Sequence, residues 1–453
     1  MGKMKIVIVG AGVVGSQIAR NLIDEDKDVV LIEKDPERAK QVSNQLDCIV
    51  INDEGNSISG LKKAGIENAD FFISVTNSDE VNMIACGIVA SEFNVPLKVA
   101  RVRNLDYSSS KLFDKSFLGI DYIVNSEVET ARQIANTVAL GATSDVMLFD
   151  GTQIQMRNII VNSKSFFREK SLREIRQSID EPFLVSGILR GDNFLIPSGE
   201  TVIRENDNIY LLATKDSLTR VFMKTGRKSE KIDKILIVGG GKIGSLVSQY
   251  LIRTGRRITI IESSYENCKR LSEKYPDALV LHADITDEQI FHEERLDKYD
   301  LLISTTDNQE LNILTCVYAK NMGVRRALAL VIKSNYLPIA SKLEIDSIIS
   351  PKNSTVDAIL KYIRKGDIKS VHSLFDGRAE VIEFCIDNKS PLSGRKILNL
   401  NMPENSLILS IIRGNTNYLP DGDFVIEKGD TVITIVRKDS IAKLEQLFTT
   451  IEY

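Results

Sequence analysis

The sequence contains the same set of segments twice, and this internal repeat constrains the fold more than any other feature. Residues 6–23 (IVIVGAGVVGSQIARNLI) return as residues 235–252 (ILIVGGGKIGSLVSQYLI), and residues 69–86 return as residues 299–316. A different segment, residues 189–213, recurs as residues 412–436, with Pro197 matching Pro420. The chain therefore reads as two halves of one unit in the order A, B, A′, B′, because a fixed internal period marks a repeated architecture.

The length of the chain indicates that it folds into several domains. A chain of 453 residues exceeds what one hydrophobic core holds, since cores stop growing beyond about 250–300 residues. Polar, turn-rich stretches lie near Gly141, over residues 223–233 and near Gly366. We expect four domains, at residues 1–128, 141–225, 232–355 and 368–453.

The A segments predict an α/β fold. Short apolar runs rich in β-branched residues alternate with longer amphipathic stretches, a pattern typical of βαβ units and a parallel sheet. In the first half these runs cover residues 5–9, 28–32, 47–51, 70–75, 97–102 and 121–124. We expect two Rossmann-like, doubly wound parallel-sheet domains. Each is followed by a small α+β domain with a mostly antiparallel sheet, because the B segments consist of short alternating runs broken by Gly, Pro, Asn and Asp.

Composition narrows the functional classes. The formal net charge is −4 with Lys and Arg scattered, so we expect no binding to nucleic acid or to an anionic membrane surface. No apolar run is long enough to span a bilayer and the N-terminus enters a strand at once, which favours a cytoplasmic location without membrane insertion. The five cysteines lack CxxC spacing and the three histidines lack a metal-site spacing, so we expect buried free thiols and no metal.

Each A segment carries a glycine-rich motif between a predicted strand and a predicted helix. Gly10, Gly12 and Gly15 directly follow an apolar strand and open a helix, and Gly239, Gly241 and Gly244 repeat this arrangement. In that context glycine permits a tight turn and a close approach of the backbone to a pyrophosphate, which the amides at the helix N-terminus then bind. The motif predicts a dinucleotide site in each half.

An acidic residue at the end of the second strand completes this fingerprint. Glu33 and Glu262 occupy that position, where a carboxylate accepts hydrogen bonds from ribose hydroxyls. A 2′-phosphate would meet the carboxylate as a like charge. NAD or an adenosine nucleotide is therefore favoured over NADP.

Other polar residues follow strands whose carboxyl ends line the ligand crevice of an open parallel sheet. Asp53, Thr76, Asn77 and Arg101 hold such positions in the first half, and Arg101 is expected either to bind phosphate or to form a surface ion pair. The position of Arg101 is Leu330 in the second half, where Lys242 in the glycine loop is a candidate replacement. The two sites should differ in affinity or ligand preference.

An enzymatic role is the alternative interpretation. Tyr107 and Lys111 form the YxxxK pattern of short-chain dehydrogenases, but the repeat has Tyr336 and Ala340 at these positions, without the lysine. The first histidine is His282, so the first Rossmann unit lacks the most frequent acid and base of hydride transfer. We expect no catalytic residues, with an NAD-dependent oxidoreductase as the competing hypothesis.

These segments together resemble the TrkA family, the regulatory subunits of Trk-type potassium uptake systems, which are built from tandem RCK (KTN) domains. The resemblance rests on GAGVVG with Glu33, SVTNSDEVNMIAC, VARVRN with Arg101, and the LRGDNFLIPSG and IRGNTNYLPDGD segments, and it runs nearly from end to end. The doubled A-B-A′-B′ order is its most specific mark, because single-copy relatives carry one A-B unit.

The resemblance implies a cytoplasmic regulator that assembles into a homo-oligomeric ring, as a dimer or tetramer. It docks on an integral membrane potassium-translocating subunit, peripherally on the inner face of the membrane, and gates it on binding NAD(H), ATP or ADP. An RCK regulator of another cation channel or antiporter is a second alternative. In some relatives the domain corresponding to B binds a cyclic dinucleotide; the segment of Arg190 and Pro197 would be the place here, although packing or dimerisation is favoured.

The fingerprint and the resemblance give a set of residues expected to contact the nucleotide. They are Gly10, Ala11, Gly12, Val13, Val14, Gly15, Glu33, Asp53, Thr76, Asn77 and Arg101 in the first half, and Gly239, Gly240, Gly241, Lys242, Ile243, Gly244, Glu262, Asp284 and Thr306 in the second.

Overall fold

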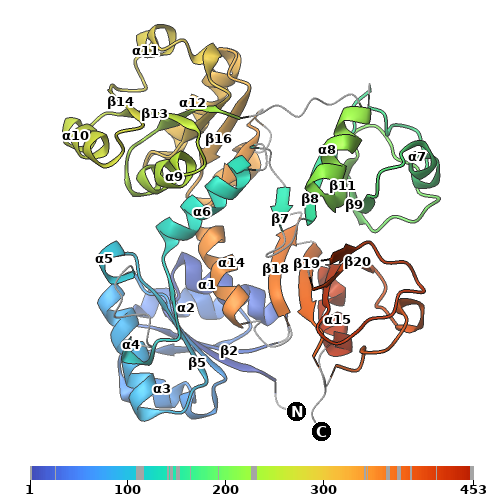
Figure 1. Ribbon diagram of the computed structural model, residues 1–453. Coiled ribbons are helices and arrows are strands. Elements are labelled where there is room, and N and C mark those ends of the chain that lie inside the picture. Colours follow the sequence, from blue (N-terminus) through green and yellow to red (C-terminus); the bar gives the residue numbers. More distant parts are fainter. Residues whose placement is uncertain are drawn as a thin grey trace. The chain divides into compact units, whose positions relative to one another are not determined.

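The computed structural model shows two compact units, each made of two stretches of chain (Figure 1). Unit 1 comprises residues 1–144 and 231–363, and unit 2 comprises residues 145–230 and 364–453. The structure describes residues 3–25, 27–108, 117–139, 142, 146–148, 154–163, 165–191, 193–225, 232–340, 343, 345–363, 368–374, 379–387, 390–414 and 416–448. Lys111, Gly141, Gly366 and residues 226–231 of the expected linker lie outside the described residues.

The first half of unit 1 is a Rossmann-like domain. Its strands are β1 (Lys5–Val9), β2 (Asp28–Glu33), β3 (Ile49–Asn52), β4 (Phe71–Ser74), β5 (Leu97–Arg101) and β6 (Tyr122–Val124). Its helices are α1 (Val13–Asp24), α2 (Pro36–Gln45), α3 (Ile58–Lys63), α4 (Asp79–Glu92), α5 (Leu105–Ser108) and α6 (Ser126–Ala139). The strands pair in parallel in the order β3-β2-β1-β4-β5-β6. The order reverses between β1 and β4, where such sheets form their ligand crevice.

The second half of unit 1 repeats this domain. Its strands are β12 (Lys234–Val238), β13 (Arg257–Glu262), β14 (Leu279–His282), β15 (Leu301–Ser304), β16 (Arg326–Leu330) and β17 (Ser347–Ile349). Its helices are α9 (Lys242–Ile252), α10 (Tyr265–Lys274), α11 (Glu288–Glu293), α12 (Gln309–Asn321), α13 (Leu337–Ala340) and α14 (Pro351–Ile363). The parallel order is β14-β13-β12-β15-β16-β17, so the predicted repeat and the predicted fold class are confirmed.

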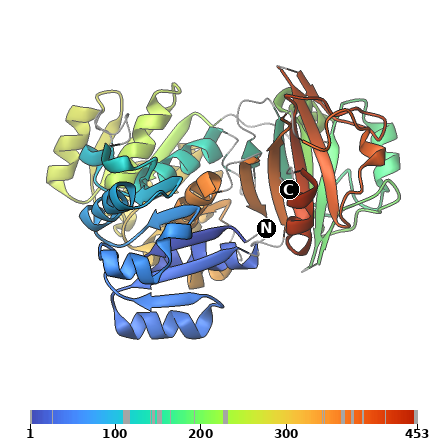
Figure 2. The ribbon, with the colours of Figure 1, turned by 90° about the horizontal axis from the view of Figure 1, so that it is seen from below.

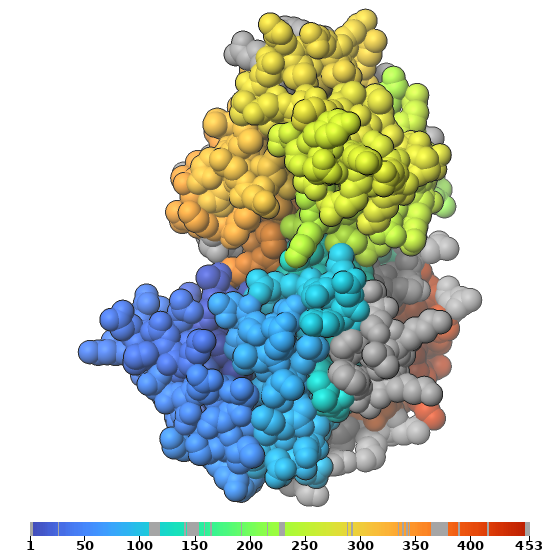
Figure 3. All heavy atoms as spheres, turned by 90° about the vertical axis from the view of Figure 1, so that its left-hand side faces the viewer, coloured from blue at the N-terminus to red at the C-terminus, as the bar shows by residue number. Residues whose placement is uncertain are grey.

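The two Rossmann-like domains exchange their last helices. Val356, Ile359 and Leu360 of α14 are buried in the core that α1 and the first sheet form. In return, Ala131 and Ile134 of α6 are buried in the core of the second sheet and α9. Atoms of the two domains meet directly in Figure 3, blue to cyan for the first and yellow to orange for the second. Each core is therefore completed by a helix from the other half of the chain.

Unit 2 holds the two small domains. The first consists of β7 (Val146–Leu148), β8 (Ile154–Ile160), α7 (Leu172–Ser178), β9 (Leu184–Arg190), β10 (Asn193–Leu195), β11 (Asn208–Thr214) and α8 (Lys215–Lys224). The second consists of β18 (Ile368–Leu374), β19 (Ala379–Cys385), β20 (Ser406–Arg413), β21 (Thr416–Tyr418), β22 (Thr431–Arg437) and α15 (Ile441–Phe448). Both sheets are antiparallel, as predicted, with orders β10-β9-β11-β8-β7 and β18-β19-β22-β20-β21.

The sheets of unit 2 pack face to face (Figure 2). Met156 and Tyr210 of the first sheet share one apolar core with Val381 and Ile433 of the second. The other face of each sheet has a core of its own beneath α8 or α15. One face of each small domain is therefore covered by the other small domain of the same chain.

Two further expectations concern cysteines and membrane spans. All five cysteines are free thiols; Cys86, Cys268 and Cys316 are buried, whereas Cys48 and Cys385 are half-buried. Burial raises the pKa of the Cys86 and Cys316 thiols, so both are inert core residues. Among the helices that the structure describes, none combines the length and the apolar character that crossing a bilayer requires.

Candidate functional site

The glycine motif forms a tight turn between β1 and α1. Gly10 has φ +95°, a left-handed conformation that side chains other than glycine rarely adopt, and its amide donates to the carbonyl of Ile32. A Cβ at Gly15 would lie 1.9 Å from the carbonyl oxygen of Gly10, so only glycine allows α1 to approach the turn this closely. A Cβ at Gly12 would meet nothing within 4 Å. The open side of Gly12 faces the crevice.

The N-terminus of α1 offers amides to an anion. Gly12 is the N-cap residue and provides no side-chain hydrogen bond, and the first turn of α1 contains no acidic residue. The first N–H groups of a helix lack intrahelical partners and carry the positive end of its dipole. Gly12, Val13 and Val14 line a cavity of about 750 Å³ at this point. The arrangement suits a phosphate group.

Glu33 lies at the end of β2 and fixes the glycine loop. Its Oε2 accepts a 2.7 Å hydrogen bond from the amide of Ala11, and its Oε1 accepts one of 3.0 Å from the amide of Asp35. The residue is 6% exposed and lines the cavity. Because each carboxylate oxygen has two acceptor positions, Glu33 can bind ribose hydroxyls while it holds the loop.

The second half reproduces this arrangement. Glu262 accepts a 2.7 Å hydrogen bond from the amide of Gly240 and one of 2.8 Å from the amide of Ser264. Gly239 has φ +97°, and a Cβ at Gly244 would lie 1.9 Å from the carbonyl oxygen of Gly239. The two glycine loops, including Ile243 in the first turn of α9, therefore share one local geometry.

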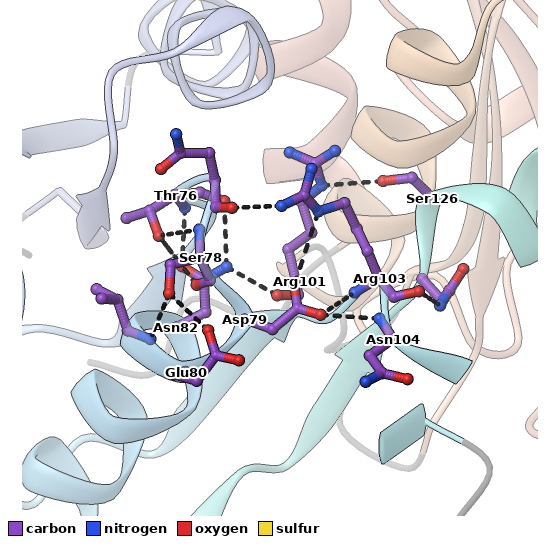
Figure 4. Close-up of polar contacts among 12 residues, drawn as sticks. Thr76, Ser78, Asp79, Glu80, Asn82, Arg101, Arg103, Asn104 and Ser126 are labelled. Carbon is purple, nitrogen blue, oxygen red and sulfur yellow. Dashed lines mark hydrogen bonds and ion pairs between the residues drawn. The ribbon is translucent and has the colours of Figure 1, made fainter. Parts of the chain in front are cut away.

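A buried asparagine connects the loops that follow β4 and β5 (Figure 4). Oδ1 of Asn82 accepts hydrogen bonds from the amide and the hydroxyl of Thr76, at 2.8 and 2.7 Å, and from the hydroxyl of Ser74 at 3.0 Å. Its Nδ2 donates to the carbonyl of Arg101 at 2.8 Å. Asn312 makes the same contacts in the second half, with Ser304, Thr306 and the carbonyl of Leu330.

Arg101 lines the cavity from the end of β5. Its Nε donates a 2.9 Å hydrogen bond to the hydroxyl of Ser126 (Figure 4). Burial, followed by the charge of Arg103, lowers the pKa of the Arg101 guanidinium, whereas Glu127 and Asp79 act in the opposite direction. Thr76 and Asn77 line the same cavity. The strand-end residues expected on the β4 and β5 side therefore lie together.

Asp53 directly follows β3, as expected, but its side chain points toward α3. Its carboxylate forms a 3.0 Å ion pair with Lys63 of α3, and it is not among the residues that line the cavity. The next residue, Glu54, lines the cavity instead. The side chain of Asp53 points toward α3 and that of Glu54 toward the cavity, because successive residues at a strand end point in different directions.

The strand register identifies the residue of the first half that corresponds to Asp284. The amides of Asp53 and Ala283 donate to the carbonyls of Glu33 and Glu262, respectively, so these two residues are equivalent. Asp284 therefore corresponds to Glu54. One of its carboxylate oxygens accepts from the amide and hydroxyl of Thr286, and these bonds lower the pKa of Asp284.

Lys242 lies in a second, smaller cavity of unit 1. This cavity has a volume of about 550 Å³, and its lining consists of Lys242 together with Asp79, Arg103, Asn104, Leu105, Asp106 and Glu127 of the first half. The lysine of the second glycine loop thus faces acidic side chains of the first domain. Its predicted role in binding phosphate in the second half remains a prediction.

Several cavity residues were not anticipated from the sequence. Glu54 and Ser126 follow β3 and β6, so the strand-end rule that found Arg101 could have found them. Lys333 and Lys352 also line the cavity, but they belong to the second half. No local signal near the first glycine motif points to residues more than 200 positions away.

Unit 2 provides no free arginine at the position suggested for a second effector. Arg190 binds both carboxylate oxygens of Asp207 at 2.8 Å and donates to the carbonyl of Val202. Arg413 and Asp430 form the same bidentate pair in the second small domain. In the described part of the chain, no three His, Cys, Asp or Glu side chains come together as they would around a metal ion.

Comparison with known proteins agrees with this doubled architecture. The sequence model of the TrkA-N domain matches residues 6–126 and 235–351, and that of the TrkA-C domain matches residues 156–226 and 381–449. The chain belongs to the TrkA family. The resemblance seen in the sequence is thereby confirmed, and the TrkA-N and TrkA-C domains coincide with the Rossmann-like domains of unit 1 and the small domains of unit 2.

The TrkA relatives are similar over their whole length. The Trk system potassium uptake proteins TrkA of Halomonas elongata and Azorhizobium caulinodans are each 32% identical, over 98% of this chain and 98% of theirs. Homolog 1 of Methanosarcina mazei is 29% identical over 98% of this chain and all of its own.

Solved structures share the fold. The structure of the GsuK channel bound to NAD has a TM-score of 0.58 at 17% identity, covering 98% of this chain and 79% of that one. The GsuK RCK domain has a TM-score of 0.57 at 18% identity, covering 98% and 95%.

Proposed function

We propose that this TrkA family member is the nucleotide-sensing regulatory subunit of a Trk-type potassium uptake system. NAD(H), ATP or ADP binds the first Rossmann crevice, and the bound state gates an integral membrane potassium-translocating subunit. The observation that carries the proposal is the crevice itself, where the glycine loop, Glu33 and Arg101 line one cavity at the reversal of the strand order. The protein acts as a homo-oligomer, without catalysis, on the cytoplasmic side of its partner.

The exchanged helices supply a route from the ligand to the rest of unit 1. The crevice adjoins α1, whose buried face packs against α14 of the second half. A nucleotide that binds one arrangement of the two domains more tightly than another shifts the population toward that arrangement. Packed helices of this kind transmit such a shift as a rigid-body movement.

The nucleotide expected at Glu33 is an adenosine nucleotide without a 2′-phosphate. Glu33, Asp35 and Glu54 line the part of the cavity beside β2 and β3, and a 2′-phosphate would be repelled there. Lys34 and Arg38 line the cavity as well and partly offset this charge. NAD(H) is therefore preferred to NADP(H), by a margin that salt reduces.

Reconstitution with the membrane subunit tests this proposal. The two proteins are co-expressed, purified together and placed in vesicles loaded with a potassium-sensitive dye, and ATP, ADP, NAD or NADH is added on the side that carries this chain. We expect at least one nucleotide to change the rate of potassium flux, and the Arg101→Leu variant to need a higher concentration of it. A flux that no nucleotide alters, in complexes shown to bind nucleotide, would overturn the regulatory role.

A further inference from the structure

The last helix of the first Rossmann-like domain, α6, packs along α9, the helix that follows the second glycine loop (Figure 1). Ala131 of α6 and Leu246 of α9 are buried in one apolar core. Glu127 and Lys242 each precede one of these core residues by four positions, or one helical turn, so each lies on the contact face of its own helix. Two opposite charges therefore lie one turn beyond the apolar contact between α6 and α9.

Both charges line the smaller cavity of unit 1, whose other charged residues are Asp79, Arg103 and Asp106. The lining thus holds three carboxylates against two cations. Asp79 is already paired, because its carboxylate accepts from the amide of Arg103 at 2.9 Å and lies 3.7 Å from Nε of the same residue. This pairing leaves Glu127 and Asp106 as the anions that Lys242 faces.

Glu127 has a buried oxygen that lacks a donor. Its Oε2 accepts no hydrogen bond from the residues that the structure describes. The negative charge of Glu127 acts on the guanidinium of Arg101, but Nε of Arg101 donates to the hydroxyl of Ser126. A buried carboxylate oxygen without a donor is costly, so a cation that approaches Glu127 would stabilise the fold.

Lys242 occupies an unfavourable place for a cation. It is the first residue of α9, where the helix dipole is positive, and the first turn of this helix contains no acidic residue. Its side chain is exposed and forms no ion pair with the described part of the chain. An acidic partner across the cavity would offset the repulsion from the helix dipole.

The two charges are both absent from the equivalent positions of the other half. Val13 is the first residue of α1, as Lys242 is of α9. Val124 and Ile349 end β6 and β17, and the carbonyl of each accepts from the residue that follows the neighbouring strand, so the two are equivalent. Three residues further on, the first half has Glu127 and the second half has lysine. The lysine of the loop and the glutamate of the last helix therefore occur together in one arrangement only.

We propose that Lys242 and Glu127 form an electrostatic latch between the two halves of unit 1. When the N-terminal turns of α6 and α9 approach each other, the ammonium of Lys242 enters the smaller cavity and pairs with the carboxylate of Glu127. The pair then holds the second glycine loop against the first domain and opposes sliding of α9 along α6. The latch gives Lys242 a role other than binding phosphate, and it does not depend on the proposed function.

Carbodiimide cross-linking tests for the contact in the full-length wild-type chain, without nucleotide. The reagent joins a lysine amine to a carboxylate where the two are in contact. Mass spectrometry of the digested protein should recover a peptide in which Lys242 is joined to Glu127, and Lys242→Arg and Glu127→Gln should each abolish it. A product that joins Lys242 to Asp106 alone, or no product at Lys242, would overturn the assignment.

A charge-exchange cycle measures the coupling. Lys242→Glu, Glu127→Lys and the double variant are unfolded thermally at low salt and in about 1 M sodium chloride, where the Debye length is about 3 Å. Each single exchange should lower the unfolding midpoint at low salt, because it places like charges together. The double exchange should restore most of that loss, and the added salt should reduce the coupling. The cycle cancels the effect that each exchange has on the dipole of its own helix.

The matched control combines Lys242→Glu with Glu129→Lys. Glu129 lies in the same first turn of α6 but does not line the cavity, so its exchange should show no coupling to Lys242. Additive shifts for the pair of Lys242 and Glu127, or a coupling equal to that of the control, would overturn the latch. If a charge-exchange variant fails to fold, the cross-link in the wild type still decides the question.

Discussion

Nδ2 of Asn82 donates a 2.8 Å hydrogen bond to the backbone carbonyl of Arg101, and this bond joins the loop after β4 to the end of β5. The same amide side chain accepts from the backbone amide of Thr76. Asn82 is completely buried, so it contacts no ligand itself. It acts as a positioning residue for the two strand ends that line the crevice.

Asn82→Ala should therefore weaken nucleotide binding without removing a ligand contact. The amide of Thr76 and the buried hydroxyl of Ser74 lose their acceptor, which costs about 1–3 kcal/mol of unfolding free energy. Asn312→Ala removes the same network from the second half and is the control. Chemical denaturation should show similar losses for both variants, and calorimetry should show reduced ATP affinity for Asn82→Ala alone. Equal ATP affinities in the two variants would contradict the positioning role.

Gly12 and Gly15 should respond differently to alanine. A Cβ at Gly15 would overlap the carbonyl oxygen of Gly10, so Gly15→Ala should destabilise the first domain by about 1–3 kcal/mol. A Cβ at Gly12 meets no atom within 4 Å and projects toward the crevice, so Gly12→Ala should fold normally but bind nucleotide more weakly. Thermal unfolding and calorimetry of both variants check this. Unaltered nucleotide binding by Gly12→Ala would place the phosphate elsewhere.

Glu33→Gln tests the carboxylate that holds the glycine loop. The amides of Ala11 and Asp35 both donate to Glu33, and the NH₂ group of glutamine would face one of these donors. We expect a loss of about 1–3 kcal/mol in stability, together with weaker nucleotide binding. Glu262→Gln should lose similar stability but leave binding at the first crevice intact. NADH titrations of both variants would refute the ribose assignment if Glu33→Gln binds as the wild type does.

The pair of Asp207 and Arg190 should make the stability of unit 2 depend on pH. Burial opposes ionisation of Asp207, but hydrogen bonds from Arg190 and the amide of Arg204 outweigh it and hold the pKa of Asp207 below its ordinary value of 3.8. A lowered folded-state pKa stabilises the fold above the unfolded-state value, and this contribution is lost as the pH falls through the folded-state pKa.

Asp207→Asn should therefore destabilise the protein by about 2 kcal/mol at pH 7, since it removes the acceptor of charge-assisted hydrogen bonds. The difference from the wild type should shrink as the pH falls below 3.8, the ordinary pKa of the carboxyl. Glu200→Gln, which breaks the exposed pair with Arg173, should change stability little at either pH. Thermal unfolding at a series of pH values measures both. A difference for Asp207→Asn that does not change with pH would rule out this ionisation as the cause.

The features that sequence alone predicted are those with a local pattern. The apolar runs at residues 5–9 and 71–74 are buried strands, and the glycine spacing fixes the turn at Gly10, because neighbours in the sequence determine both. The position of Glu33 follows from the same local geometry. Each of these patterns occurs in both halves of the sequence, so chance does not explain them.

The features that sequence did not predict depend on contacts between distant residues. An amphipathic pattern shows that α6 and α14 each bury a face, but it does not say which sheet covers that face. The exchange of the two helices, and with it the presence of Lys352 in the lining of the first cavity, is set by packing between the halves. The shift from Asp53 to Glu54 is a one-residue effect of side-chain direction at the end of β3.

Nucleotide binding by the intact chain tests the sensing role of the first crevice. ATP, ADP and NADH are titrated by calorimetry into the wild type and into Arg101→Leu, which installs the residue of the second half, and the nucleotides are recovered afterwards by chromatography. We expect saturable binding that Arg101→Leu weakens roughly tenfold, with the nucleotides recovered unchanged. Absence of binding, equal affinity in both proteins, or consumption of a nucleotide would contradict the sensing role.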